Sequence, residues 1–317
     1  MANNVYVIGF NGFGDCIYQF PFVKKASERF EEVYLMTAFP FLYESLKNVK
    51  YVRPQTGLLT CLESMKQYRE DFWVPAPMDP VDPTQYRLDN TPFTFLYHDG
   101  MKDGKSMMES WNETIPIYEG TSIDFSIPIP RDHYDVALRI YNRIAFGTNK
   151  KICLLHQPGT RKEWVNYARL PKTEYFQFLI DEFKDEYYFV SVGNKNVEDY
   201  IGKLHTIDLR FDYGELNLMT IMALASLSDM VISYISFLIA CGVASGTKTF
   251  CLFGGYIRPE MWIDYKYMDM DKIGYVAPID FCNCHDRLHE CNKEIELERL
   301  YSEFRDFAHR EEELSEA

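Results

Sequence analysis

The sequence has no apolar run long enough to span a membrane and no excess of positive charge. Its 317 residues carry a net charge of −14, which repels polyanions and argues against broad non-specific binding of nucleic acid. The first residues, MANNVYVIGF, include no basic stretch, so we expect no signal peptide. With 47% hydrophobic and 25% charged residues, the composition is ordinary for a globular protein. These features predict a cytoplasmic protein of two domains.

Cysteines at disulfide-like spacings are also lacking. The eight cysteines are mostly scattered, and Cys153, Cys241 and Cys251 lie inside apolar runs. That placement predicts small buried thiols in a reducing compartment.

One cluster of cysteine and histidine lies near the C-terminus, at Cys282, Cys284, His285, His289 and Cys291. This density of thiols and imidazoles can bind zinc, but CxC followed by a third cysteine seven residues later is not a standard ligand pairing. The sequence leaves a structural metal open here, and we predict no catalytic metal.

The dinucleotide fingerprint GxGxxG is absent. An apolar strand is expected over residues 5–10, then a glycine-rich loop with the spacing GxxGxG, a helix over 16–30 and a strand over 33–37. No acidic residue follows the second strand to hold a ribose. This pattern predicts a βαβ unit and argues against a nucleotide-dependent oxidoreductase.

Asp15 is the candidate catalytic residue of that loop. Asn11, Gly12 and Gly14 precede it, and the glycines permit a tight turn and a close approach of backbone to a ligand. Asp15 can act as an N-terminal cap or first-turn acid of the helix, or as a general base that faces a substrate. Spacing alone favours the first interpretation. Further along, His98 follows a predicted strand over 93–97 and can either face a substrate or have a structural role.

A second candidate site follows the strand expected over residues 152–155. The turn Pro158-Gly159 comes next, and then Arg161 and Lys162, before a helix over 172–184. Ligands of open α/β sheets bind at the carboxyl ends of strands, and a fixed pair of cations suits a phosphate. The alternative is a surface loop that is merely basic.

The second half of the chain alternates between helix and strand periodicity. After residue 186 we expect strands over 187–192, 206–209, 230–234 and 249–253, and helices over 197–204, 218–227 and 236–244. This is a doubly wound pattern. A polar break at 147–151 predicts an N-terminal Rossmann-like domain over 1–147, a C-terminal one over 148–290, and a helix with an acidic tail over 291–317. Gly193, Gly254 and Tyr256 follow strands and are weaker candidates for nucleotide contact.

Taken together, these stretches resemble glycosyltransferase family 9, the ADP-heptose:lipopolysaccharide heptosyltransferases, which have the GT-B fold. The likeness is best over residues 5–30 and 151–255. The family's Gly-Asp pair before the first helix corresponds to Gly14-Asp15, which implies that Asp15 is the catalytic base. Its Pro-Gly turn and Lys-x-Trp element correspond to Pro158-Gly159 and Lys162-Glu163-Trp164, which implies that Lys162 contacts donor phosphates. The resemblance also implies two Rossmann-like domains that face a central cleft.

One departure from the family concerns an Asp-Ser/Thr-Gly-x-x-His element after the strand at 230–233. Here the residues are Ser233-Tyr234-Ile235-Ser236-Phe237-Leu238, so the Asp, the Gly and the His are all replaced. We expect the hydroxyls of Ser233, Tyr234 and Ser236 to bond a phosphate at the start of the next helix.

The leading hypothesis is an inverting, metal-independent glycosyltransferase with Asp15 as its base. A nucleotide-diphosphate sugar is its co-substrate, and no cofactor is expected. The acceptor can be a glycan, a lipid-linked saccharide, a small molecule or a modified base. The alternative is a non-catalytic nucleotide- or sugar-binding protein on the same fold, which the lost element supports. Neither the donor's base and sugar nor the oligomeric state follows from the sequence.

Overall fold

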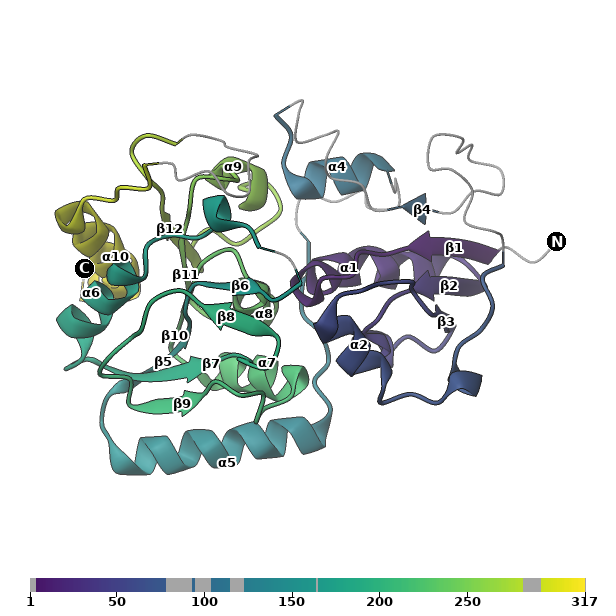
Figure 1. Cartoon of the computed structure of the whole chain (residues 1–317), viewed down its shortest axis with the longest axis horizontal. Coiled ribbons are helices and arrows are strands. Elements are labelled where there is room, and N and C mark those ends of the chain that lie inside the picture. Colours follow the sequence, from purple (N-terminus) through teal and green to yellow (C-terminus); the bar gives the residue numbers. More distant parts are fainter. Residues whose placement is uncertain are drawn as a thin grey trace. The chain divides into compact units, whose positions relative to one another are not determined.

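The computed structural model describes residues 4–77, 93–94, 104–114, 123–163, 165–281 and 292–316. The chain divides into two compact units (Figure 1). The first unit is Met1–Pro128 with Glu260–Tyr267, and the second is Ile129–Pro259 with Met268–Ala317.

The first unit contains a parallel sheet with the strand order β3-β2-β1-β4 within the described residues. Its strands are β1 (Asn4–Ile8), β2 (Glu32–Met36), β3 (Val49–Val52) and β4 (Phe93–Thr94). Its helical segments are α1 (Phe13–Arg29), η1 (Pro40–Tyr43), α2 (Leu59–Met65), η2 (Glu70–Phe72) and α4 (Met107–Thr114).

Helix α1 connects β1 to β2 and completes the predicted βαβ unit. Ten of its residues are buried, among them Ile17, Phe20 and Val23, because apolar side chains recur at helical spacing. The hydroxyl of Tyr43 in η1 donates to the carbonyl of Cys16 at 2.9 Å, so the start of α1 is tied to the connection between β2 and β3.

The second unit contains a parallel sheet with the order β12-β11-β10-β5-β7-β9 across the described segments. These strands are β5 (Lys151–His156), β7 (Tyr187–Val192), β9 (Leu209–Phe211), β10 (Met230–Ser233), β11 (Thr249–Leu252) and β12 (Ile273–Val276). A short antiparallel ribbon pairs β6 (Gly159–Arg161) with β8 (Glu198–Tyr200).

Helices of the second unit cover both faces of its sheet. Helix α7 (Leu218–Leu227) packs between α5 (Arg131–Gly147) and α8 (Phe237–Ser245), and α6 (Thr173–Phe183) packs against α10 (Leu297–Glu316) (Figure 1). The second unit also contains the turn η4 (Tyr167–Arg169). The short helix α9 (Pro259–Trp262) begins at the last residue before the segment Glu260–Tyr267, which belongs to the first unit. No helix in the described part of the chain has both the length and the apolar character that a membrane span requires.

The division of the chain therefore differs from the predicted boundary at 147/148. Helix α5 belongs to the second unit because it packs against α7, and it buries Ala137 and Ile144. The polar break after it is a loop within one unit, not a linker between two.

The C-terminal helix is likewise part of the second unit rather than a separate segment. Phe304 of α10 is fully buried, and its ring contacts Phe183 at 4.6 Å and Phe250 at 5.1 Å between centroids. Aromatic pairs at these distances contribute stability beyond the area they bury.

The predicted helix over 197–204 is wrong. Glu198 to Tyr200 are extended and pair with Gly159 to Arg161, so a tertiary hydrogen-bonded pairing overrides the local preference. The strand expected over 206–209 begins at Leu209 instead, and β12 was not predicted at all.

Replacing Phe304 by alanine tests whether α10 is part of the core. We expect Phe304→Ala to lower the free energy of unfolding by about 3–5 kcal/mol, because it removes a buried ring from a packed interior. Phe146→Ala is the matched control, since Phe146 is 96% exposed on α5 and its loss should change stability by less than about 0.5 kcal/mol. Urea unfolding followed by circular dichroism measures both. Equal stability of the two variants would contradict the placement of α10.

Candidate functional site

The candidate site of the second unit lies at the carboxyl ends of β5 and β10. These strands are parallel neighbours, and His156 pairs with Ser233 at their last shared position. Helix α8 begins shortly after β10 ends, with Ser236 as its N-terminal cap. Ligands of open α/β sheets bind at this edge, where the N–H groups at the start of a helix favour an anion.

A fully buried histidine organises this edge. The Nδ1 atom of His156 lies 3.0 Å from the hydroxyl oxygen of Ser236, and its Nε2 atom lies 3.0 Å from a carboxylate oxygen of Glu198. The ring stacks on Tyr234, with 5.4 Å between centroids and 26° between planes. Neither His156 nor Glu198 was predicted as a site residue, although His156 directly follows the apolar run of β5.

The predicted phosphate ligands Ser233 and Tyr234 have internal partners in this structure. Both are buried, and the hydroxyl of Tyr234 donates to the carbonyl of Gly159 at 3.1 Å. Ser233 bonds the hydroxyl of Ser236 at 2.7 Å and the carbonyl of His156 at 3.2 Å. Ser236 alone of the three is partly exposed. The two buried hydroxyls are therefore bonded within the protein at this edge of the sheet, and their contact with a phosphate stays a prediction.

Two arginines lie near this edge, and a lysine follows one of them in the chain. Arg161 is half-buried at the end of β6, and Lys162 after it is exposed. Arg169 of η4, which was not predicted from the sequence, donates from Nη2 to the carbonyl of Ile235, the residue before the cap of α8. Burial raises the pKa of the Tyr234 phenol, with the charge of Glu198 adding to the rise and those of Arg169 and Arg161 opposing it. The field of both arginines therefore reaches this edge.

The structure gives the predicted glycines Gly193 and Gly254 packing roles. A methyl group added to Gly193 would overlap the hydroxyl of Tyr200, and one added to Gly254 would overlap the backbone of Arg169. Gly255 also donates to the carbonyl of Ala168 at 2.8 Å. Gly254 thus lets η4 lie against the end of β11 and places Arg169. Tyr256 is half-buried, and its contact with a nucleotide stays a prediction.

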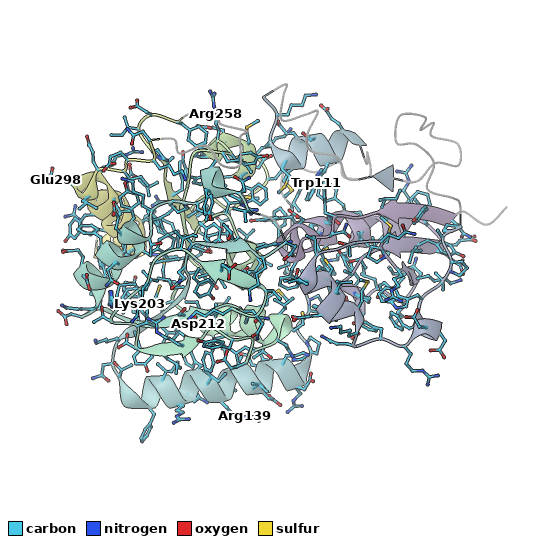
Figure 2. The ribbon with its side chains drawn as sticks, in the orientation of Figure 1. Trp111, Arg139, Lys203, Asp212, Arg258 and Glu298 are labelled. Carbon is cyan, nitrogen blue, oxygen red and sulfur yellow. The ribbon has the colours of Figure 1, made fainter. Side chains whose placement is uncertain are left out.

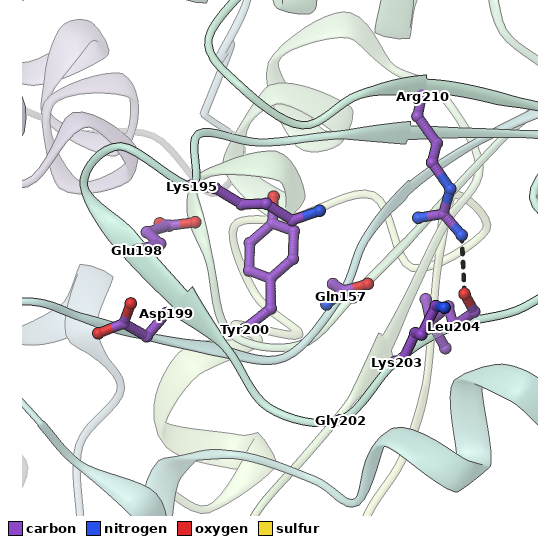
Figure 3. A pocket seen from close by; sticks show the side chains of 9 residues that line it. All are labelled: Gln157, Lys195, Glu198, Asp199, Tyr200, Gly202, Lys203, Leu204 and Arg210. Atoms are coloured by element: carbon purple, nitrogen blue, oxygen red, sulfur yellow. Dashed lines mark hydrogen bonds between the residues drawn. The ribbon is translucent and has the colours of Figure 1, made fainter.

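A pocket of about 460 Å³ lies beside the ribbon, where all three residues of β8 line it (Figure 3). Lys195 lies over the rings of Tyr200 and Tyr213 at 5.1 and 5.0 Å, and pairs with the buried carboxylate of Asp212 at 3.3 Å. Arg210 pairs with the same carboxylate at 3.2 Å. The pocket is lined by Gln157, Lys195, Glu198, Asp199, Tyr200, Gly202, Lys203, Leu204 and Arg210. Its size suits a small molecule, and its lining is polar and of mixed charge.

In the first unit, the glycine loop lies between β1 and α1 as predicted. Gly12 is the cap residue of α1, and Asp15 is half-buried in the first turn of the helix. A methyl group on Gly12 would overlap the Asp15 carboxylate, so that carboxylate lies directly over the glycine. Gly14 is half-buried in the same turn.

Two buried thiols donate hydrogen bonds to backbone carbonyls of this loop. Cys16 donates to the carbonyl of Phe10 at 3.2 Å, and Cys61 of α2 donates to the carbonyl of Asn11 at 2.7 Å. Burial raises the pKa of the Cys16 thiol, which keeps it protonated and able to donate. The side-chain oxygen of Asn11 is buried and has no hydrogen-bond partner among the described residues. The predicted buried thiols are confirmed for Cys153, Cys241 and Cys251 as well.

Other predicted positions fall outside the described residues. They are His98, Trp164 of the Lys-x-Trp element, and the cluster of Cys282, Cys284, His285, His289 and Cys291. Within the described ranges, no group of three or more potential metal ligands comes together. Trp262 packs edge to face against Tyr18 within the first unit, with 5.9 Å between ring centroids.

No family model and no curated protein matches this sequence. Its structure is nevertheless similar to solved glycosyltransferases along nearly its whole length. The family 9 glycosyltransferase from Veillonella parvula matches with a TM-score of 0.60 at 13% identity, covering 97% of each chain. E. coli ADP-heptose LPS heptosyltransferase II matches with a TM-score of 0.57 at 13% identity, covering 98% of this chain and 99% of that one.

A third similar structure is E. coli heptosyltransferase WaaC with ADP, which has a TM-score of 0.52 at 12% identity. The match covers 97% of this chain and 98% of WaaC. These likenesses confirm the predicted fold, that of the GT-B glycosyltransferases of family 9.

Two tyrosines beside His156 offer a matched test of this site. The buried hydroxyl of Tyr200 finds no hydrogen-bond partner in the described part of the chain, whereas that of Tyr234 bonds Gly159. We expect Tyr200→Phe to leave the free energy of unfolding unchanged or to raise it by up to about 1 kcal/mol, and Tyr234→Phe to lower it by about 1 kcal/mol. Thermal and urea unfolding measure both. A larger loss in Tyr200→Phe than in Tyr234→Phe would contradict this geometry.

Proposed function

We propose that this chain is a glycosyltransferase that uses a nucleotide-diphosphate sugar as its donor. The observation that supports this most is the joint placement of Arg161, Arg169 and the start of α8 at the carboxyl ends of β5 and β10. The guanidinium groups of arginine and the N–H groups at the start of a helix can both bind a phosphate without a metal. The fold likeness to glycosyltransferases agrees with this assignment.

The donor's diphosphate is proposed to bind between this edge and the exposed Lys162. The similar heptosyltransferase WaaC was solved with ADP, and we propose a nucleoside diphosphate of that class for this chain. Its nucleoside is proposed to occupy the neighbouring polar pocket, which shares Glu198 with the edge of the sheet.

The chemistry requires a base and a stabilised leaving group. Asp15 is proposed to take the proton of the acceptor hydroxyl as that oxygen attacks the anomeric carbon. The bond between that carbon and the diphosphate breaks, and the charge that develops on the diphosphate is stabilised by Arg161, Lys162 and Arg169. Attack from the face opposite the leaving group inverts the anomeric carbon. These residues supply the positive charge without a metal.

One observation favours a second candidate, a non-catalytic nucleotide- or sugar-binding protein. Ser233 and Tyr234 are turned inward, so the edge offers fewer hydroxyl donors than the sequence predicted. The two candidates differ in what Asp15 does: a transferase needs its carboxylate for turnover, and a binding protein does not.

Nucleotide binding tests the donor site. In a thermal-shift screen of nucleotides and nucleotide sugars, we expect a nucleoside diphosphate to raise the melting temperature. Lys162→Ala and Arg161→Ala should each weaken that ligand about tenfold, because each removes a charged contact to phosphate. Arg139→Ala on α5 (Figure 2) is the control, since it removes an equal charge from an exposed helix and should leave affinity unchanged. If no nucleotide stabilises the wild type at saturation, the donor site is wrong.

Turnover tests the role of Asp15. With the nucleotide sugar that stabilises the protein, we expect Asp15→Asn to lower release of the nucleoside diphosphate about 10²–10⁴-fold while the donor binds with unchanged affinity. Asp132→Asn is the matched control, because Asp132 is also a first-turn acid, on α5. A full rate in Asp15→Asn, or donor binding without turnover in the wild type, would favour the binding protein.

A further inference from the structure

A buried carboxamide faces the pocket beside the ribbon. Gln157 directly follows β5 and is only 3% exposed, yet its side chain lines the pocket (Figure 3). That side chain makes no hydrogen bond to any other described residue. A carboxamide has two N–H donors and an oxygen acceptor, and a buried one that leaves them unmet costs stability. Gln157 therefore offers the pocket a complete set of hydrogen-bonding groups.

The backbone on both sides of Gln157 is fixed by contacts with distant segments. His156 before it has a partner at each ring nitrogen. The carbonyl of Pro158 after it accepts from the backbone N–H of Ile201 at 2.9 Å, and Gly159 pairs with Tyr200 in the ribbon. The carboxamide is thus held at the pocket by its neighbours in the chain, so a ligand there would meet a group that is already in place.

The charges around this pocket nearly balance, which favours an uncharged polar group over a phosphate. Two of the three cations in the lining, Lys195 and Arg210, are paired with the buried carboxylate of Asp212 at 3.3 and 3.2 Å. The third, Lys203, is exposed, and two carboxylates of β8 line the same pocket. A phosphate in the pocket would meet both signs of charge, whereas a neutral group would avoid that repulsion.

The remaining lining suits a flat ring. Tyr200 contributes an aromatic side chain, and Leu204, which is 1% exposed, contributes an aliphatic one. A volume of about 460 Å³ is ample for a purine or a pyrimidine. Nucleobases carry a hydrogen-bond donor beside an acceptor on one edge, and a glutamine carboxamide matches such an edge with two parallel hydrogen bonds. The pocket therefore combines a neutral environment, apolar surface and a group of the complementary pattern.

We propose that Gln157 recognises the base of the nucleotide donor, through one hydrogen bond that it donates and one that it accepts. This inference rests on the proposed donor site, because the diphosphate has to lie at the start of α8 for its nucleoside to enter this pocket. Gln157 is then a specificity-determining residue, since it contacts the base and not the reacting atoms. It selects among nucleotides, while the arginines hold the part that all nucleotides share.

Isothermal titration calorimetry of the full chain with ADP, GDP, CDP, UDP and inorganic pyrophosphate tests base recognition. We expect the wild type to discriminate among the four nucleotides. Gln157→Met keeps the size of the side chain and removes both hydrogen-bonding groups. It should weaken the preferred nucleotide about tenfold and reduce the differences among the four. Pyrophosphate should bind Gln157→Met as it binds the wild type, because it has no base.

Gln157→Glu changes the pattern rather than removing it. An ionised carboxylate can only accept, and guanine presents two adjacent donors, N1–H and its amino group. We expect the affinity for GDP, taken relative to that for pyrophosphate, to rise against the other three nucleotides. Lys203→Met is the control, since Lys203 lines the same pocket but is exposed, and its loss should leave the order of preference unchanged.

Urea unfolding without nucleotide separates recognition from a structural role. Gln157→Met should not lower the midpoint, because the carboxamide gives up no hydrogen bond to a described residue. A lower midpoint would show that the protein itself uses this group and would overturn the inference. Equal affinity of the wild type for all four nucleotides, or an unchanged preference in both Gln157 variants, would overturn it too and leave the donor site standing. Failure of pyrophosphate and of every nucleotide to bind would overturn both.

Discussion

The buried imidazole of His156 is the constraint on which the candidate site depends. A histidine with no exposed surface must satisfy both ring nitrogens within the protein, because an unpaired buried polar atom costs about 1–3 kcal/mol. One nitrogen needs Glu198, and this holds β8 against the end of β5. The other needs Ser236, and this fixes the residue that caps α8. Two chain segments 42 and 80 residues away are thus tied to one strand end.

This constraint explains why the hydroxyls of Ser233, Tyr234 and Ser236, at the end of β10 and just after it, bond within the protein. Ser233 and Ser236 complete the hydrogen bonds of the imidazole and of the strand end, while Tyr234 stacks on the ring and bonds Gly159. The positive character of the edge therefore comes from Arg161, Arg169 and the helix start rather than from these side chains. The phosphate site that we propose would therefore depend on charge and backbone more than on hydroxyl donors.

The sequence predicted those parts of the fold whose signal is local and long. Helices α1, α6 and α7 and strands β5 and β7 lie within a few residues of their expected bounds, because apolar periodicity over such segments is strong. The ribbon of β6 and β8 was missed, since three-residue strands have no period to detect and form only through pairing between distant segments. The boundary predicted at 147/148 differs from the observed one because the polar break after α5 does not indicate which unit that helix packs against.

In the candidate site too, residues with a local sequence signal could be predicted, and residues placed by contacts between distant segments could not. Asp15, Arg161 and Lys162 lie near glycines in the sequence and could therefore be chosen from it. Arg169 is placed by its contact with Ile235, and Glu198 by its contact with His156, and neither contact has a local sequence signal. Glycines show the limit of this reasoning most directly. A glycine after a strand reliably indicates that something approaches the backbone closely. At Gly193 that neighbour is a tyrosine, and at Gly254 it is the backbone of the segment that carries Arg169. Both glycines therefore have packing neighbours within the protein, and their contact with a nucleotide stays a prediction.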